Sequence, residues 1–110
     1  MRAQPSLLFE QFKRLAVEAD AKVRAVSGRT LLDAAAGAAN DRYLAQFQVY
    51  GYLMARSSLR SRAALLEELY WLKRTPLKTP PEVVDVDRFG LFRLALIDEL
   101  IVSLGGVSHW

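Results

Sequence analysis

The chain has 110 residues, with 15 Lys and Arg against 12 Asp and Glu, one His, no Cys and 52% hydrophobic residues. This length suits a single domain, residues 1–110, which buries about 65% of its unfolded surface and therefore folds without a metal or a disulfide. The absence of cysteine excludes disulfide scaffolds, thiolate zinc sites, iron–sulfur clusters and cysteine nucleophiles. The formal charge of +3 is only mildly basic.

The first segment predicts a helix, because its apolar residues recur at intervals of three and four rather than two. Pro5 suits the first turn of this helix, where its missing N–H has no helical partner. Gly28 is a natural residue for its end. The predicted apolar stripe consists of Leu8, Phe12, Leu15, Ala19, Val23 and Val26.

A second helix is predicted over residues 31–56. Without a break it would run about 39 Å, longer than the diameter of about 26 Å expected for a domain of this size. The helix therefore either protrudes or breaks, and both possibilities stay open; a break would fall at Gly37 or at Asn40-Asp41, where Asn40 would cap the second half. The predicted stripe consists of Leu32, Ala36, Ala39, Tyr43, Phe47, Tyr50 and Met54.

A third helix is predicted to begin at Ser58 or Ser61, since either residue can cap it, and to end before Pro76. Its predicted stripe consists of Leu59, Ala63, Leu66, Leu69 and Leu72. The following stretch, residues 79–81, reads Thr-Pro-Pro and predicts a stiff, extended loop.

The last helix is expected to begin at a cap formed by Asp85 or Asp87 and to end at Gly105-Gly106. Two carboxylates beside a helix start are better explained as caps than as a cation site. The sequence as a whole therefore predicts an all-α fold, a compact array of four helices, or of five if the second one breaks, with a Pro-rich loop before the last helix.

Apolar residues cover the last helix nearly all round, and only Arg88, Ala95 and Glu99 form a narrow polar strip, with Asp98 to one side of it. Such a helix is either enclosed by its neighbours or packed against another chain, and both interpretations stay open. If part of this surface is an interface, the candidate contact residues are Phe92, Leu96, Val102 and Leu104, with Trp110 as a further anchor.

Arg93 lies within the apolar arc of that helix, four residues from both Phe89 and Ile97. A charged group in such a place must pair or extend to water. Its stem can lie over apolar neighbours with the guanidinium solvated. The alternative is a pair with a carboxylate, such as Asp33, Glu68 or one from a partner subunit, which makes Arg93 a candidate buried or interfacial charge.

Few residues are suited to catalysis. The single histidine, His109, lies next to the C-terminal Trp110, where a held geometry is rarely available. The chain has no Glu-x-x-His motif, no phosphate-binding glycine loop and no paired zinc ligands. We therefore predict a protein that is not an enzyme, with no cofactor, no bound metal and no small-molecule substrate.

The basic residues concentrate at residues 1–30 and 41–80, whereas residues 81–110 carry net negative charge. Arginines and serines at the start of the third helix could contact phosphates, assisted by the amides of the helix N-terminus. The candidate phosphate contacts, in two groups at opposite ends of that helix, are Arg56, Arg60, Arg62, Lys73, Arg74 and Lys78. A plain solvated surface and a protein-binding patch remain alternatives.

The leading prediction is a small, non-enzymatic helical interaction subunit that self-associates or docks into a larger protein assembly through its last helix. The alternative is a basic accessory subunit that binds the nucleic-acid backbone without reading bases. The apolar stretch at residues 7–9 is too short for a signal-peptide core, and charges interrupt residues 89–104 before they reach the length of a membrane span. We therefore expect a cytoplasmic protein without a membrane partner.

Overall fold

The predicted all-α class is confirmed. The computed structural model describes residues 5–27, 34–56 and 61–107. These three stretches contain four α-helices and no strand: α1 Pro5–Ser27, α2 Ala34–Met54, α3 Arg62–Arg74 and α4 Val86–Ser103.

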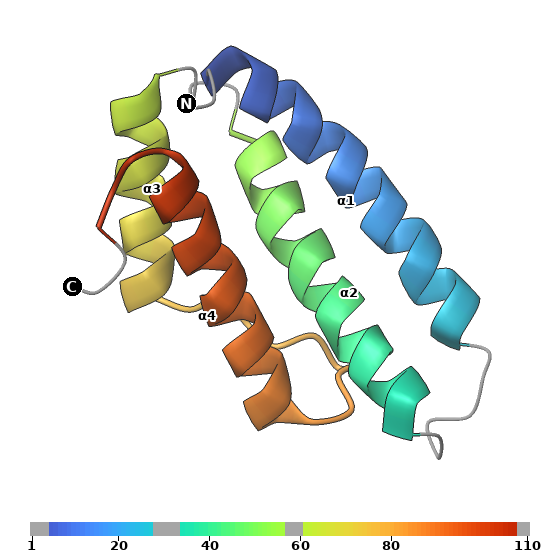
Figure 1. Ribbon diagram of the computed structural model, residues 1–110. Helices are drawn as coiled ribbons and strands as arrows, with labels where there is room; N and C mark the ends of the chain where they lie inside the picture. Colours follow the sequence, from blue (N-terminus) through green and yellow to red (C-terminus); the bar gives the residue numbers. More distant parts are fainter. Residues whose placement is uncertain (1–4, 28–33, 57–60, 108–110) are drawn as a thin grey trace.

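Helix α2 is the central element of the array (Figure 1). Helix α1 packs antiparallel along one side of it, and α4 packs along the other side in the same direction as α2. Helix α3 runs antiparallel beside α4. Because α2 and α4 are parallel, the loop at residues 75–85 must carry the chain back from the end of α3 to the level where α2 begins.

The two helix starts that the sequence left open are now assigned. Helix α3 is capped by Ser61, whose Oγ accepts a hydrogen bond of 3.1 Å from the amide of Ala64. Helix α4 is capped by Asp85, whose Oδ1 accepts a hydrogen bond of 3.1 Å from the amide of Arg88. The alternative cap Ser58 lies outside the described residues.

The predicted end of α4 at Gly105-Gly106 is confirmed. Gly105 has a φ of 82°, a left-handed conformation that glycine adopts without the cost of a Cβ. The amide of Gly105 donates to the carbonyl of Val102, and the amide of Gly106 donates to that of Ile101, each at 2.9 Å. This pair of bonds is the Schellman motif, which satisfies carbonyls that the helix itself leaves open.

Of the two possibilities for the second helix, the unbroken one is observed, and the described residues contain no fifth helix. Helix α2 continues through Gly37, Asn40 and Asp41, so Asn40 does not cap a second half. The long helix fits because the molecule is elongated, with extents of 42 × 27 × 25 Å. The two polar residues do not interrupt the helix because their side chains bond to a distant loop rather than to the local backbone.

The predicted single apolar stripe of the second helix is also wrong. Helix α2 lies between α1 and α4, so its buried residues spread over two sides, and they are Gly37, Asn40, Asp41, Leu44, Ala45, Val49, Tyr50 and Leu53. Leu32 of the predicted stripe lies outside the described residues, and of the other six only Tyr50 is buried, while Phe47 is 42% exposed.

The hydrophobic core draws on all four helices. Its main cluster consists of Phe12, Ala16, Val49, Tyr50, Leu53, Leu65, Leu69, Leu72, Ile97, Ile101 and Leu104. A second, smaller cluster packs Phe89 of α4 against Leu44 and Ala45 of α2. This smaller cluster lies toward the end of the molecule where α2 and α4 both begin.

At that end, the fully buried carboxylate of Asp41 joins α2 to the start of α4. Its Oδ1 accepts from the amide of Val84 at 2.7 Å, and its Oδ2 accepts from the amide of Asp85 at 3.0 Å. The same Oδ2 also accepts from Nε and Nη2 of Arg88, at 3.1 and 2.7 Å. An anion at a helix N-terminus is favoured by the helix dipole, and hydrogen bonds to a charged group are the strong ones.

We expect Asp41→Asn to lower the free energy of unfolding by about 3 kcal/mol, since it leaves backbone donors and Arg88 without their charged acceptor in a buried site. The matched control is Asp87→Asn, the same change on an exposed residue in the first turn of α4, which should lower it by less than about 1 kcal/mol. Urea unfolding of the two variants measures both values. Equal losses would contradict the central role of Asp41.

Candidate functional site

Helix α4 has a packed side and an open side. The packed side places Phe89, Ile97 and Ile101 in the core. The open side leaves Leu91 67% exposed and Val102 58% exposed, with Leu94 at 40%. An apolar helix with one face in the core and a second apolar face toward solvent is the most distinctive surface feature in the described part of the chain.

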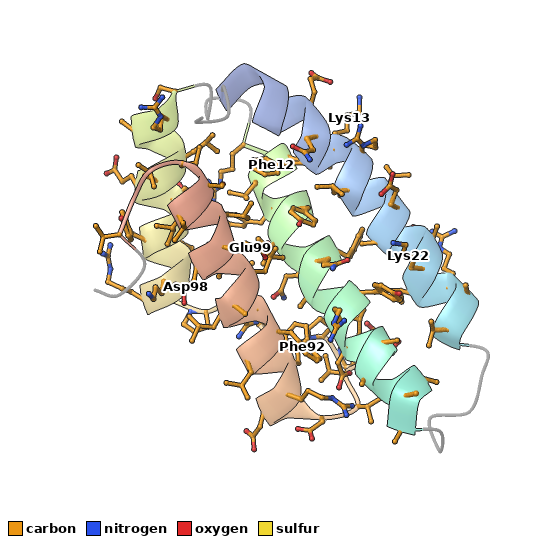
Figure 2. The ribbon with its side chains drawn as sticks, in the orientation of Figure 1. Phe12, Lys13, Lys22, Phe92, Asp98 and Glu99 are labelled. Atoms are coloured by element: carbon orange, nitrogen blue, oxygen red, sulfur yellow. The ribbon has the colours of Figure 1, made fainter. Side chains whose placement is uncertain are left out.

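Three exposed residues and the half-buried Asp98 align along the helix axis. Leu91, Ala95, Asp98 and Val102 are separated by four, three and four residues, which places them on one face of the helix. We call these four residues the outer seam. In Figure 2, Asp98 lies on the α3 side of α4, whereas Phe92 and Glu99 lie on its α2 side, so Asp98 forms the edge of the outer seam toward α3 and Phe92 and Glu99 border the seam toward α2.

The predicted interface residues do not share one surface. Phe92 and Leu96 are half-buried on the α2 side, where the guanidinium carbon of Arg42 lies 4.9 Å from the centre of the Phe92 ring. Val102 belongs to the outer seam. Leu104 is 1% exposed and forms part of the core, so the structure corrects its assignment to a contact surface. Trp110 lies outside the described residues.

A shallow groove of about 170 Å³ separates α4 from α2 beside the outer seam. Arg42 and Glu99 are exposed within it, and Phe92 and Ala95 contribute to its walls. The groove therefore carries both signs of charge next to apolar surface. Glu99 also lies close enough to Tyr50 that its charge adds to the effect of burial in raising the pKa of that phenol.

Sequence reasoning missed Leu91 and Leu94 as surface residues. A signal for Leu91 was available, because the polar strip at Arg88, Ala95 and Glu99 marks the outward direction and Leu91 lies one turn before Ala95. Periodicity alone did not separate the apolar residues of this helix that face the core from those that face solvent. A small domain does not have enough neighbouring elements to cover a helix completely.

Arg93 binds neutral groups rather than a carboxylate. Its Nη1 donates to Oε1 of Gln48 and to the carbonyl of Leu77, both at 2.9 Å, and its guanidinium carbon lies 4.9 Å from the centre of the Phe89 ring. Burial lowers the pKa of Arg93 below its usual value. Glu68 is engaged elsewhere, with Arg56, and the other suggested partner, Asp33, lies outside the described residues.

Gln48 completes this contact, because its Nε2 donates to the carbonyl of Lys78 at 2.6 Å. Arg93 and Gln48 together hold the loop at Leu77 and Lys78 against α2 and α4. The nearby Asn40 does the same for Glu82, whose carbonyl accepts from its Nδ2 at 3.1 Å. Arg93, Gln48 and Asn40 therefore hold the loop in place, although polar side chains of these types are usually expected to face solvent.

Among the described candidates for phosphate contact, Arg56 and Arg74 line the same groove along α3, and acidic residues lie beside some of the basic ones. Nε of Arg56 lies 3.7 Å from Oε1 of Glu68. Nζ of Lys73 lies 2.8 Å from Oδ1 of Asp98, and its side chain is only 18% exposed. The other candidates divide: Arg74 and Lys78 are exposed, Arg62 is half-buried, and Arg60 lies outside the described residues.

An aromatic groove of about 520 Å³ separates the end of α2 from α3. The rings of Tyr52 and Trp71 stack at 6.1 Å with an angle of 10° between their planes. Tyr52 donates to Glu68 and accepts from Arg56, and burial together with the Glu68 carboxylate raises the pKa of Tyr52. Glu67 and Glu68 line this groove together with Arg56 and Arg74, so its formal charges cancel and it presents no net positive charge to a phosphate chain.

The described residues include no group of three or more His, Cys, Asp and Glu side chains arranged to hold a metal ion. Among the same residues, no helix has both the length and the hydropathy needed to cross a membrane. Asp85 acts as a helix cap, and His109 lies outside the described residues. Comparison of the chain with protein-family models, curated proteins and solved structures gives no match.

We expect Arg93→Met to lower the free energy of unfolding by about 2 kcal/mol, since it keeps the apolar stem but removes two hydrogen bonds from a charged donor. The matched control is Arg42→Met. Arg42 also lies 4.9 Å from a phenylalanine ring but is exposed, so the loss there should be about 0.5 kcal/mol. Thermal or urea unfolding distinguishes the two, and equal losses would show that Arg93 behaves as a solvated cation.

Proposed function

We propose that this protein is a small, non-enzymatic helical module that binds another protein through the outer seam of α4. The observation that carries the proposal is the alignment of Leu91 and Val102, 67% and 58% exposed, on one face of a helix whose opposite face builds the core. An amphipathic helix that docks against a partner uses anchors with this helical spacing. Full burial of one such side chain contributes about 1.5–3 kcal/mol.

Isolated exposed apolar residues are common, and Val17 of α1 provides the comparison within this chain. Val17 is 64% exposed, about as much as Leu91. Its neighbours one turn away include Lys13, Arg14 and Asp20, so it is a single apolar residue among charges. Leu91 has Leu94 and Ala95 one turn away toward the C-terminus and Asp87 and Arg88 one turn away toward the N-terminus, and Asp98 lies between Ala95 and Val102. The outer seam nevertheless places a second exposed aliphatic residue, Val102, on the face of Leu91, which favours a binding role.

The test compares Leu91→Glu with Val17→Glu, two substitutions by the same helix-compatible charged residue at positions of similar exposure. Tagged wild-type and variant chains are used to capture proteins from an extract of the source organism, and each protein recovered is then titrated as a purified component. We expect Leu91→Glu to weaken binding at least about tenfold, because it replaces a buried apolar contact with a charge, and Val17→Glu to bind as the wild type does.

Equal affinity of the wild type and Leu91→Glu for every purified partner would contradict the proposal. Circular dichroism and urea unfolding of both variants provide the folding control. Because both positions face solvent, neither substitution should change the free energy of unfolding by more than about 0.5 kcal/mol.

Binding to a nucleic-acid backbone is the second candidate, supported by the exposure of Arg74 and Lys78 near the end of α3. The acidic partners of Arg56 and Lys73 weigh against it, because a cation held by a carboxylate must exchange that partner for a phosphate. Two exposed cations give at most a shallow dependence of affinity on salt, with a slope of about −2 on logarithmic axes.

We therefore expect no binding of a fluorescent oligonucleotide at physiological salt. At low salt, any weak binding should disappear in the double variant Arg74→Gln/Lys78→Gln, whose matched control is Lys13→Gln/Arg14→Gln on α1. Anisotropy titrations at several salt concentrations measure this. A salt slope steeper than about −4, or tight binding at physiological salt, would favour the nucleic-acid function over the proposed one.

A further inference from the structure

We propose that the partner of the outer seam is a second copy of this chain, bound so that two α4 helices pack antiparallel about a two-fold axis. This inference rests on the proposed function and names its partner. The argument begins from the spacing of the outer seam. Intervals of four, three and four residues read the same in both directions, so an inverted second copy places its own seam positions in register with them.

The two-fold axis passes between residues 96 and 97, midway along the seam. Leu91 of one copy then lies opposite Val102 of the second copy, and Ala95 lies opposite Asp98. Alternation of three and four is the spacing of helices that pack side by side along a seam. The two exposed aliphatic residues therefore cover each other at both ends, while the small Ala95 permits close approach near the centre.

Charge selects the antiparallel arrangement. In a parallel pair Asp98 would face Asp98 across the seam. In the antiparallel pair each Asp98 faces an alanine, and its carboxylate keeps the ion pair of 2.8 Å with Lys73 on the α3 side. Like charges opposite each other across a seam oppose association, so the parallel arrangement is disfavoured.

The α2 side of the seam adds charge complementarity. Phe92 and Glu99 are nearly symmetric about the proposed axis, so Glu99 of one copy lies beside Phe92 of the other. The guanidinium of Arg42 covers that Phe92, and both Arg42 and Glu99 are exposed in the groove beside the seam. The two-fold axis therefore brings a free-standing carboxylate of each copy toward an exposed guanidinium of the other, twice in one interface.

The size of the contact sets the expected strength. Helix α4 is about 27 Å long at about 1.5 Å per residue, and a single helix pair of this length buries less than the standard interface of about 1,200 Å² or more. We therefore expect a reversible dimer with a dissociation constant of about ten to a hundred micromolar.

Sedimentation equilibrium of the full chain between about 5 and 500 µM tests the association, a range that brackets the expected constant. We expect the wild type and Val17→Glu to dimerise alike and Leu91→Glu to raise the dissociation constant at least about tenfold. Glu99→Arg and Arg42→Glu should each weaken the dimer several-fold, and the double variant Glu99→Arg/Arg42→Glu should recover most of the loss, since it restores opposite charges.

The absence of cysteine allows a direct test of register. A mixture of Leu91→Cys and Val102→Cys chains should form a mixed disulfide on mild oxidation, because these positions lie opposite each other. Leu91→Cys alone should form little, since the two copies of residue 91 would be about 16 Å apart along the helix axis, beyond disulfide reach. Disulfide formation mainly by Leu91→Cys alone would overturn the antiparallel arrangement.

The outcomes separate this inference from the function on which it rests. A wild type that stays monomeric at 500 µM, with a different purified protein losing affinity for Leu91→Glu, overturns the second copy and leaves the proposed function standing. A dimer that Leu91→Glu does not weaken overturns the inference as well, and it places self-association on another surface.

Discussion

The buried carboxylate of Asp41 is the interaction on which the remaining geometry depends. It is 0% exposed and lies inside a helix, yet it accepts hydrogen bonds from two amides and a guanidinium at the start of a helix more than forty residues later. Because α2 and α4 are parallel, nothing in the local chain brings their beginnings together. A charged acceptor satisfied on every side joins them, and the helix dipole of α4 adds to its stability.

From this anchor the position of α4 follows in steps. Asp41 fixes the first turn of the helix, and Arg93, two turns further on, bonds to Gln48 of α2 and to the loop carbonyl of Leu77. These two sets of polar contacts, one at the first turn of α4 and one at Arg93, fix the position of α4 along its axis and its rotation about that axis. The loop between α3 and α4 is held by the same residues together with Asn40, so its prolines do not act alone to shape it.

The sequence predicted well the features that depend on neighbours in the chain. The caps at Ser61 and Asp85 and the glycine end of α4 follow from the local needs of helix termini. It failed where distant elements decide. Asn40 and Asp41 resemble a helix break because these residue types usually bond to their own backbone, and only the loop at residues 82–85 gives them another partner.

The candidate site, like the fold, was predictable from the sequence only in part. Periodicity identified α4 as unusually apolar, but it could not distinguish Leu104, which lies in the core, from Leu91, which faces solvent. From the formal charge, Arg56 and Lys73 were likewise interpreted as basic surface. In the fold, Arg56 lies beside Glu68 and Lys73 beside Asp98, two carboxylates from other parts of the chain. Both errors arise because residue type reports what a side chain prefers, whereas packing decides which preference is satisfied.

The polar contacts also explain why the outer seam, rather than another apolar strip of α4, faces outward. A helix that is apolar nearly all round gains similar burial energy in several rotations, so hydrophobic packing by itself selects its orientation weakly. A rotation by one residue, about 100°, would move Arg93 away from Gln48 and Leu77 and would direct its charge into the core. The free-energy cost of that unpaired charge exceeds the gain from covering Leu91. Leu91 is therefore exposed because α4 is held in the rotation in which Arg93 keeps its hydrogen bonds.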